Sequence, residues 1–372
     1  NTQTIRIDSH EQFGILHAFG SEFMPSALSK LAHYKGERPI FDLFNIDDEI
    51  QLALGRKVML KSGGYLIVDQ TEAIDALLEE YNMTDCHPGL TPVKPGFYLR
   101  ATDSENSDPR YSHLTGTLLW LLQTRPDLNF AVTTMSRHVR KNDDTHMAYG
   151  RQVMRYLKRT RTTGLTLRAS SDLQLRCWVD SSYAEDPDTR RSCSSIIITL
   201  GSSVVFSKVF LQPTVAVSSC EAELNGFFEA ALWLEFFRRI AAFMGITQHG
   251  PTTVYADSAS AIALLKKRVP SGRSKHYDVR YFRINESIDR GEIALQWIST
   301  QLMPADIGTK PLPRPRFTEL AGPLLDGRLD GVFAPLRLDD PAPSRRCVHS
   351  SRFEQSTQES PLRPVTHAVR TT

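Results

Sequence analysis

The sequence lacks the features that would place the chain in a membrane or outside the cell. No apolar run approaches the roughly 18 residues of a membrane-spanning helix, and no signal peptide is visible. The five cysteines are odd in number and widely spaced, without a CxxC pair or the Cys/His spacing of a zinc site. We therefore predict reduced thiols in an intracellular protein at Cys86, Cys177, Cys193, Cys220 and Cys347.

The chain also lacks an initiating methionine and begins at Asn1, so we expect a fragment or a processed piece of a longer protein. Its 372 residues are enough for two domains that each bury a core. A hydrophobic content of 41% and a charged content of 23% are typical of soluble globular proteins.

Excess charge of one sign is absent overall, because the formal net charge is only +2. Basic residues nevertheless concentrate in two segments. Residues 137–168 hold nine Lys/Arg against two Asp, and residues 266–290 hold eight against three acids, local excesses of +7 and +5. Such clusters can bind phosphate, although most charge runs are only solvated surfaces. Charge alone therefore does not decide whether the chain binds nucleic acid.

The first half of the chain is predicted to combine a hairpin with helices. Residues 57–68 alternate around Gly63-Gly64, which is typical of a β-hairpin. Helices are expected at residues 70–81, 111–123 and 147–160, with a Pro-, Gly- and Asp-rich loop at 87–109. Residues 1–43 have weak periodicity and are left unassigned.

From residue 173 the pattern changes to strands followed by helices. Strands are expected at residues 173–180, 194–200, 204–208, 252–257 and 292–299. Helices are expected at 220–244, 258–267, at 274–290 with a basic character, and from near Pro304. Three meandering strands followed by alternating helices and strands predict a mixed α/β layer fold. Residues 331–372 are rich in Pro, Ser, Arg and Thr, which indicates a disordered tail.

Four acids in the second half lie where a predicted strand or helix begins or ends: Asp180, Glu223, Asp257 and Asp306. Each has an ordinary structural explanation. Asp180 can start a turn, Asp257 can cap a helix, and Asp306 can complement the dipole of a first helical turn. Converging carboxylates would instead hold two divalent cations that bracket a phosphate. Position alone does not decide between these alternatives.

The helix that begins near residue 220 carries two candidate acids. Ser218 and Glu221 have the S-x-x-E spacing of a capping box, which gives Glu221 a structural role. Glu223 lies about 200° further round the helix and is free to bind a metal. We therefore predict Glu223 as the ligand and keep Glu221 as the alternative.

Five segments in the second half resemble, in order and spacing, the ribonuclease H domain of Ty1/copia-type retrotransposon Pol polyproteins. They are Trp178-Val-Asp-Ser-Ser-Tyr-Ala-Glu-Asp with Thr189-Arg-Arg-Ser-Cys-Ser, Gln212-Pro-Thr-Val-Ala-Val-Ser-Ser-Cys-Glu-Ala-Glu, Asp257-Ser-Ala-Ser-Ala-Ile, Arg273-Ser-Lys-His-Tyr-Asp-Val-Arg-Tyr, and Pro304-Ala-Asp-Ile-Gly-Thr-Lys-Pro-Leu. Upstream, the segments that resemble the family's thumb and connection region are Phe44-x-x-x-Asp48, Leu54-Gly55, Gly116 with Leu118-Leu119, Thr124-Arg-Pro-Asp and Arg155-Tyr-Leu-Lys-Arg-Thr.

The resemblance implies an α/β fold of the ribonuclease H type, a mixed sheet flanked by helices, at residues 172–320. A small α+β thumb/connection region would precede it at residues 44–168, and the disordered tail would follow it. The resemblance implies that Asp180, Glu223, Asp257 and Asp306 bind two Mg²⁺ or Mn²⁺ ions. It also suggests that Lys275, His276 and Arg280 approach the backbone of an RNA–DNA hybrid, although a lone His on a basic helix is more often a surface or capping residue.

The resemblance further implies partners and a location. The partners would be the hybrid and the remaining reverse transcriptase (palm and fingers) and integrase parts of the polyprotein, with no membrane. The location would be cytoplasmic, in a virus-like particle, and/or nuclear.

Three departures from the family limit this interpretation. The polymerase Tyr-x-Asp-Asp is missing, since Asn45-Ile-Asp-Asp lies beyond the palm position, and with palm and fingers absent no polymerase activity is expected. Cys220 replaces the usual Ser or Thr, and Gly308 replaces a larger apolar residue, which could loosen the site. The first 40 residues resemble no recognisable family, consistent with a decayed or mis-joined element.

The main hypothesis is a metal-dependent endonuclease that cleaves the RNA strand of RNA–DNA hybrids. One alternative is a catalytically inactive nucleic-acid-binding remnant. Another is a structural part of a larger reverse transcriptase.

Overall fold

The computed structural model describes residues 50–53, 55–61, 64–104, 107–267 and 278–329. The unassigned residues 1–43 and the predicted tail at 331–372 lie outside these ranges. Among the described helices, none is long and apolar enough to cross a membrane.

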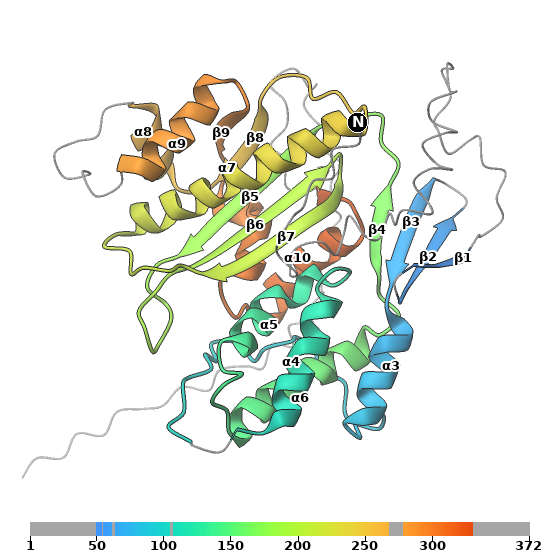
Figure 1. The fold of residues 1–372 in the computed structure, drawn as a ribbon. Helices are drawn as coiled ribbons and strands as arrows, with labels where there is room; N and C mark the ends of the chain where they lie inside the picture. Colours follow the sequence, from blue (N-terminus) through green and yellow to red (C-terminus); the bar gives the residue numbers. More distant parts are fainter. Residues whose placement is uncertain (1–49, 54, 62–63, 105–106, 268–277, 330–372) are drawn as a thin grey trace, which may run out of the picture. The chain divides into compact units, whose positions relative to one another are not determined.

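The larger sheet has five strands in the order β7-β6-β5-β8-β9 (Figure 1). Its strands are β5 (Leu175–Ser182), β6 (Cys193–Leu200), β7 (Ser203–Leu211), β8 (Thr252–Ala256) and β9 (Ile293–Trp297). The first three pair antiparallel, whereas β8 runs parallel to both β5 and β9. The three meandering strands and the mixed α/β sheet predicted from the sequence are confirmed.

Helices cover this sheet because its strands bury side chains on both faces. On one face, Cys177 and Val179 of β5 join a core with α7 (Ser219–Phe243), α8 (Ala259–Lys266) and α9 (Asp278–Asp289). On the other face, Trp178 joins a second core that extends into the upstream helices and α10 (Arg314–Leu325). The period-two alternation of β5 thus serves two cores.

The upstream region combines a four-stranded antiparallel sheet with helices (Figure 1). The sheet contains β1 (Ile50–Ala53), β2 (Arg56–Lys61), β3 (Tyr65–Asp69) and β4 (Leu165–Arg168). The helices are α3 (Thr71–Glu80), α4 (Pro109–Leu121), η2 (Pro126–Leu128), α5 (Asn129–Ser136) and α6 (Asp144–Arg159). The predicted hairpin and the three predicted helices are confirmed, with Lys61 facing Tyr65 across the turn.

Two elements differ from the sequence prediction. Helix α5 was missed because its Val and Thr residues have low helix propensity, and its burial in the core overrides that preference. The helix expected from Pro304 is only a 3₁₀ segment, η5 (Pro304–Gly308), and α10 begins later. The intervening Pro311 and Pro313 disfavour helical backbone in the residues before them.

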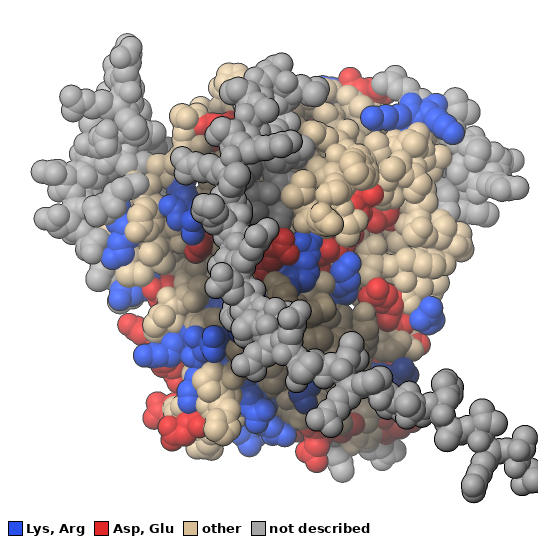
Figure 2. Space-filling view, turned by 180° about the vertical axis from the view of Figure 1, so that it is seen from behind, with Lys and Arg blue, Asp and Glu red and all other residues tan. Residues whose placement is uncertain are grey.

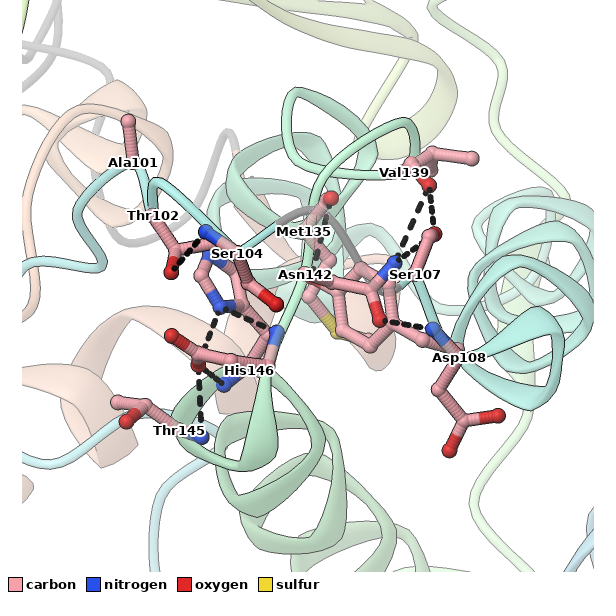
Figure 3. Close-up of polar contacts among 12 residues, drawn as sticks. Ala101, Thr102, Ser104, Ser107, Asp108, Met135, Val139, Asn142, Thr145 and His146 are labelled. Atoms are coloured by element: carbon pink, nitrogen blue, oxygen red, sulfur yellow. Dashed lines mark hydrogen bonds and ion pairs between the residues drawn. The ribbon is translucent and has the colours of Figure 1, made fainter.

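Polar side chains tie the loop before α4 to the loop before α6 (Figure 3). The Asn142 carboxamide accepts a hydrogen bond from the Asp108 N–H at 2.9 Å and donates one to Ser107 Oγ at 2.7 Å. Asp143 and His146 form a capping box at the start of α6. Because each of these groups completes a loop or a helix end, this polar cluster has a structural explanation and needs no ligand.

Candidate metal centre

Two of the predicted acids come together because β5 and β8 are parallel. Asp180 lies near the carboxyl end of β5, and Asp257 directly follows β8. The carboxyl ends of parallel strands meet at one edge of the sheet, so the two side chains converge there. Thr309 Oγ donates a hydrogen bond to Asp180 at 2.7 Å, and Thr300 Oγ donates one to Asp257 at 2.7 Å.

The third acid comes from the first turns of α7. Ser218 caps this helix by accepting a hydrogen bond from the Glu221 N–H at 3.1 Å. The Glu221 carboxylate accepts from the N–H of Val217 at 2.6 Å, one residue earlier than the capping box would place it. Glu221 is therefore engaged at the helix start. Glu223 is buried beside Asp180 and Asp257 instead.

One oxygen from each of Asp180, Glu223 and Asp257 lies within 4.8 Å of the others. Burial, followed by repulsion from Asp306, raises the pKa of Asp180 to about 7. Burial and the neighbouring Asp180 raise the pKa of Glu223 well above its ordinary value. Glu223 Oε2 is buried without a hydrogen-bond partner. A hard divalent cation would both neutralise this cluster and supply the missing partner, so the three residues fit such an ion.

The fourth predicted acid, Asp306, is not part of this three-residue group. It lies in η5 and is only 3% exposed. Its two carboxylate oxygens contact Lys310 Nζ at 2.6 Å and Arg316 Nη2 at 3.3 Å. Asp306 is close enough to raise the pKa of Asp180, but two cations of the chain already balance its charge.

Gly308 does not loosen the site, contrary to the sequence expectation. A Cβ on Gly308 would collide with Ser195 Oγ and with Val209 Cγ2, because η5 lies directly against β6 and β7. Glycine is what this close approach requires, and a larger residue would push Asp306 away from Asp180. The effect of Cys220, which is half-buried near the start of α7, stays a prediction.

The predicted hybrid-binding residues are only partly described. Lys275 and His276 lie outside the described residues. Arg280, on α9, donates a hydrogen bond to Asn225 Oδ1 on α7, and its guanidinium lies 5.9 Å from the centre of the Phe228 ring. Arg280 is thus engaged within the fold rather than directed freely at solvent.

Many basic side chains of residues 137–168 also have partners within the chain. Arg137 pairs with Asp186, Arg161 with Asp75, and Lys158 donates to a backbone carbonyl of Cys86. On the face seen in Figure 2, Lys and Arg are interspersed with Asp and Glu. The local excess of positive charge in the sequence therefore overstates the phosphate-binding capacity of this segment.

Sequence reasoning missed Gln212 and Thr309 as supports of the site. Gln212 is fully buried and links Asn225 on α7 to Ser194 on β6 and to the Ala222 carbonyl. Thr309 orients Asp180. Both residues lie inside the motifs quoted above, but only the tertiary contacts assign them a role.

Comparison with known proteins gives two different matches along the chain. The chain is 31% identical over 298 residues to a retrovirus-related Pol polyprotein from transposon TNT 1-94 of Nicotiana tabacum, covering 77% of this chain and 22% of that protein. It is 29% identical over 258 residues to the corresponding polyprotein from transposon RE1 of Arabidopsis thaliana, covering 69% and 18%. The chain therefore spans about a fifth of the length of these relatives.

The second match lies at the N-terminus. The family model described as "Ribonuclease E/G family" matches residues 1–77. Ribonuclease G of Escherichia coli K12 is 60% identical over 70 residues, which is 19% of this chain and 14% of that protein. The match includes residues 1–43, so the expectation that they resemble no recognisable family is wrong, and it continues past the predicted boundary at residue 44.

Solved ribonuclease H structures are among the structural matches. The crystal structure of LC11-RNase H1 in complex with RNA/DNA hybrid has a TM-score of 0.29 and 13% identity, covering 37% of this chain and 94% of that chain. RNase H1 from Halobacterium salinarum NRC-1 has a TM-score of 0.26 and 12% identity, covering 36% and 90%.

The strand order and the Pol relatives together define the class of this protein. The five-stranded part is a ribonuclease H-like domain, as its order of antiparallel and parallel strands indicates. The predicted resemblance to a retrotransposon Pol polyprotein is confirmed.

Proposed function

We propose that this chain cleaves the RNA strand of RNA–DNA hybrids in a reaction that depends on a divalent cation, as the ribonuclease H part of a retrotransposon Pol polyprotein. One observation carries the proposal. Three carboxylates from three different elements bring their oxygens within 4.8 Å, and Glu223 Oε2 is buried without a partner. The Pol polyprotein relatives favour this substrate over others.

Neighbouring residues of the chain position the three carboxylates before any substrate binds. Asp180, Glu223 and Asp257 would hold the cation, whose Lewis acidity would lower the pKa of a water molecule and polarise the scissile phosphate. Thr309 and Thr300 fix the orientations of Asp180 and Asp257 by hydrogen bonds. The Gln212 network fixes the first turns of α7 and with them Glu223. Contacts to 2′-hydroxyl groups in the wide minor groove would select the RNA strand.

The test compares two glutamates of the same helix. The full chain is incubated with an RNA–DNA hybrid labelled on the RNA strand, in Mg²⁺ or Mn²⁺. Glu223→Gln should lower the cleavage rate by at least about 100-fold, because it removes a metal ligand. Glu221→Gln, the matched control, should keep the rate within a few-fold and cost about 1 kcal/mol of stability through the weakened helix start.

Two outcomes would contradict the proposal. Cleavage that is unaffected by Glu223→Gln or by Asp257→Asn would refute the assignment of these residues to the metal site. Tight hybrid binding without cleavage in either cation would favour the inactive nucleic-acid-binding alternative.

A further inference from the structure

We propose that exposed apolar side chains around the metal centre pack against sugars of the bound nucleic acid, and that Trp297 makes the largest of these contacts. Tyr183, Val217 and Trp297 form this apolar rim. The inference rests on the proposed function and refines it, because it assigns substrate contacts that do not depend on charge.

Each element that supplies a converging acid, or lies next to one, also carries an exposed apolar side chain. Tyr183 directly follows β5, three residues after Asp180, and is 46% exposed. Val217 comes just before the Ser218 cap of α7 and is 76% exposed. Trp297 ends β9 and is 53% exposed. Single exposed apolar residues are ordinary on a protein surface, but three around one polar centre indicate a surface that a ligand covers.

Trp297 is held beside the metal centre by the polar edge of its indole. Strand β9 runs parallel to β8 with Trp297 opposite Ala256, so the indole lies at the same edge of the sheet as Asp257. The indole Nε1–H donates a hydrogen bond to the backbone carbonyl of Asp257 at 3.0 Å. Because this bond satisfies the polar group of the indole, the exposed part of the side chain is apolar and suited to packing.

A nucleic acid is the ligand that fits this rim. A scissile phosphate at the three carboxylates would bring the neighbouring nucleotides over the ends of β5 and β9. Aromatic side chains bind nucleotides without regard to sequence. In a duplex the bases are stacked on one another, so an exposed ring at the wide minor groove meets sugars.

Nearby basic side chains leave a need for such uncharged contacts. Arg280 is bonded to Asn225 on α7. Lys310 and Arg316 both contact Asp306. Cations that are engaged within the fold have less charge to offer a phosphate, so packing of the apolar rim contributes a larger share of the affinity for the substrate.

The test separates the face of the indole from its N–H in hybrid cleavage by the full chain. Trp297→Ala removes both, whereas Trp297→Phe keeps an aromatic face and loses the hydrogen bond to Asp257. Trp297→Ala should raise KM about 10-fold and Trp297→Phe less than about 3-fold, with kcat nearly unchanged in both. Tyr183→Ala should raise KM by a smaller factor. Phe243→Ala, a control at the exposed end of α7, should leave KM unchanged. Circular dichroism establishes that each variant is folded.

Binding gives a readout that is independent of cleavage. Fluorescence anisotropy of a labelled hybrid is measured in the Glu223→Gln background, where cleavage is expected to be blocked. Adding Trp297→Ala should raise Kd about 10-fold, and by the same factor at low and at high salt, because packing of a ring on a sugar releases no counterions.

Three outcomes discriminate the inference from the proposed function. Unchanged KM and Kd in Trp297→Ala would overturn the inference and leave the proposed function standing. An equal fall of kcat in Trp297→Ala and Trp297→Phe, with KM unchanged, would also overturn it, since the indole would then only hold Asp257 in place. Hybrid binding that weakens in Trp297→Ala, in a chain whose wild type does not cleave, would refute the proposed function and support the apolar rim as a nucleic-acid-binding surface.

Discussion

Glu221 and Glu223 lie two residues apart on α7 and serve different purposes. The carboxylate of Glu221 receives the N–H of Val217, whereas Glu223 is buried next to Asp180 and Asp257. The helical rotation of about 200° between them separates the helix start from the metal centre. This difference was predictable from the sequence because both capping and helical rotation depend on local spacing.

Asp180 provides a prediction about stability and pH. Its pKa of about 7 in the folded chain exceeds the ordinary 3.8, so the folded state binds more protons than the unfolded state between these values. Stability contributed by this group is therefore complete below about pH 4 and declines as the pH rises towards 7. Without metal at pH 8, Asp180→Asn should stabilise the chain by about 1–4 kcal/mol, although it abolishes metal binding.

Urea unfolding in EDTA at pH 5 and pH 8 measures this effect. The stabilisation should be smaller at pH 5, where the wild-type carboxyl keeps its proton. Asp85→Asn, at an exposed position, should change stability by less than about 0.5 kcal/mol at either pH. A destabilising effect of Asp180→Asn at pH 8 would show that the cluster is not under electrostatic strain.

At the scale of elements, the segment Thr124-Arg-Pro-Asp has a structural explanation. Arg125 and Asp127 form a two-bond ion pair at 3.0 and 2.8 Å, and both side chains are fully buried. Arg125 also donates to the carbonyl of Thr160 at the end of α6, and Tyr156 donates to Asp127 at 2.7 Å. The network joins η2 to α6. A motif that resembled a family signature is thus explained by packing.

We expect Arg125→Met to destabilise the chain by about 3–5 kcal/mol, because it leaves the buried Asp127 charge without its partner. Chemical denaturation measures the change. The matched control is Arg161→Met, which breaks an ion pair with Asp75 whose side chains are 49% and 46% exposed. That change should be below about 1 kcal/mol. Equal losses of stability in both variants would refute the conclusion that burial makes the Arg125–Asp127 pair more important than the exposed pair.

The elements that the sequence predicted are those with a strong local signal. Strand β5 alternates clearly, and α3 has apolar residues at helical spacing. Helix α5 and the late start of α10 were not predicted, because core packing and two prolines act against the local pattern there.

At the scale of the whole molecule, two kinds of sequence meet in one chain. Residues 1–77 match the ribonuclease E/G family, whereas most of the chain resembles Pol polyproteins. The matched N-terminal segment ends within α3, and its strand β3 pairs with β4 through Val68 and Leu165. Strands β1–β3, from the matched N-terminal segment, therefore complete a sheet with a strand that lies nearly 100 residues later.

This arrangement predicts different effects of two truncations. Removing residues 1–49 leaves every described strand and its pairing in place, so we expect the melting temperature and hybrid cleavage to stay nearly unchanged. Removing residues 1–69 deletes β1–β3 and exposes the edge of β4, which should lower the melting temperature by several degrees. Thermal unfolding and the hybrid assay measure both effects. Loss of cleavage after the shorter truncation would assign the N-terminal match a part in the activity.

The sequence by itself determined the class of fold, a candidate set of four acids and the choice of Glu223 over Glu221. These follow from periodicity, spacing and motif order, which are local properties of the chain. Only the tertiary structure decided that Asp306 is paired with Lys310 and Arg316, that Gly308 is required by the close approach of η5 to β6 and β7, and that Arg280 is engaged with α7. Those contacts join residues of different elements, and their energies depend on burial and on neighbouring charge, which residue spacing does not encode.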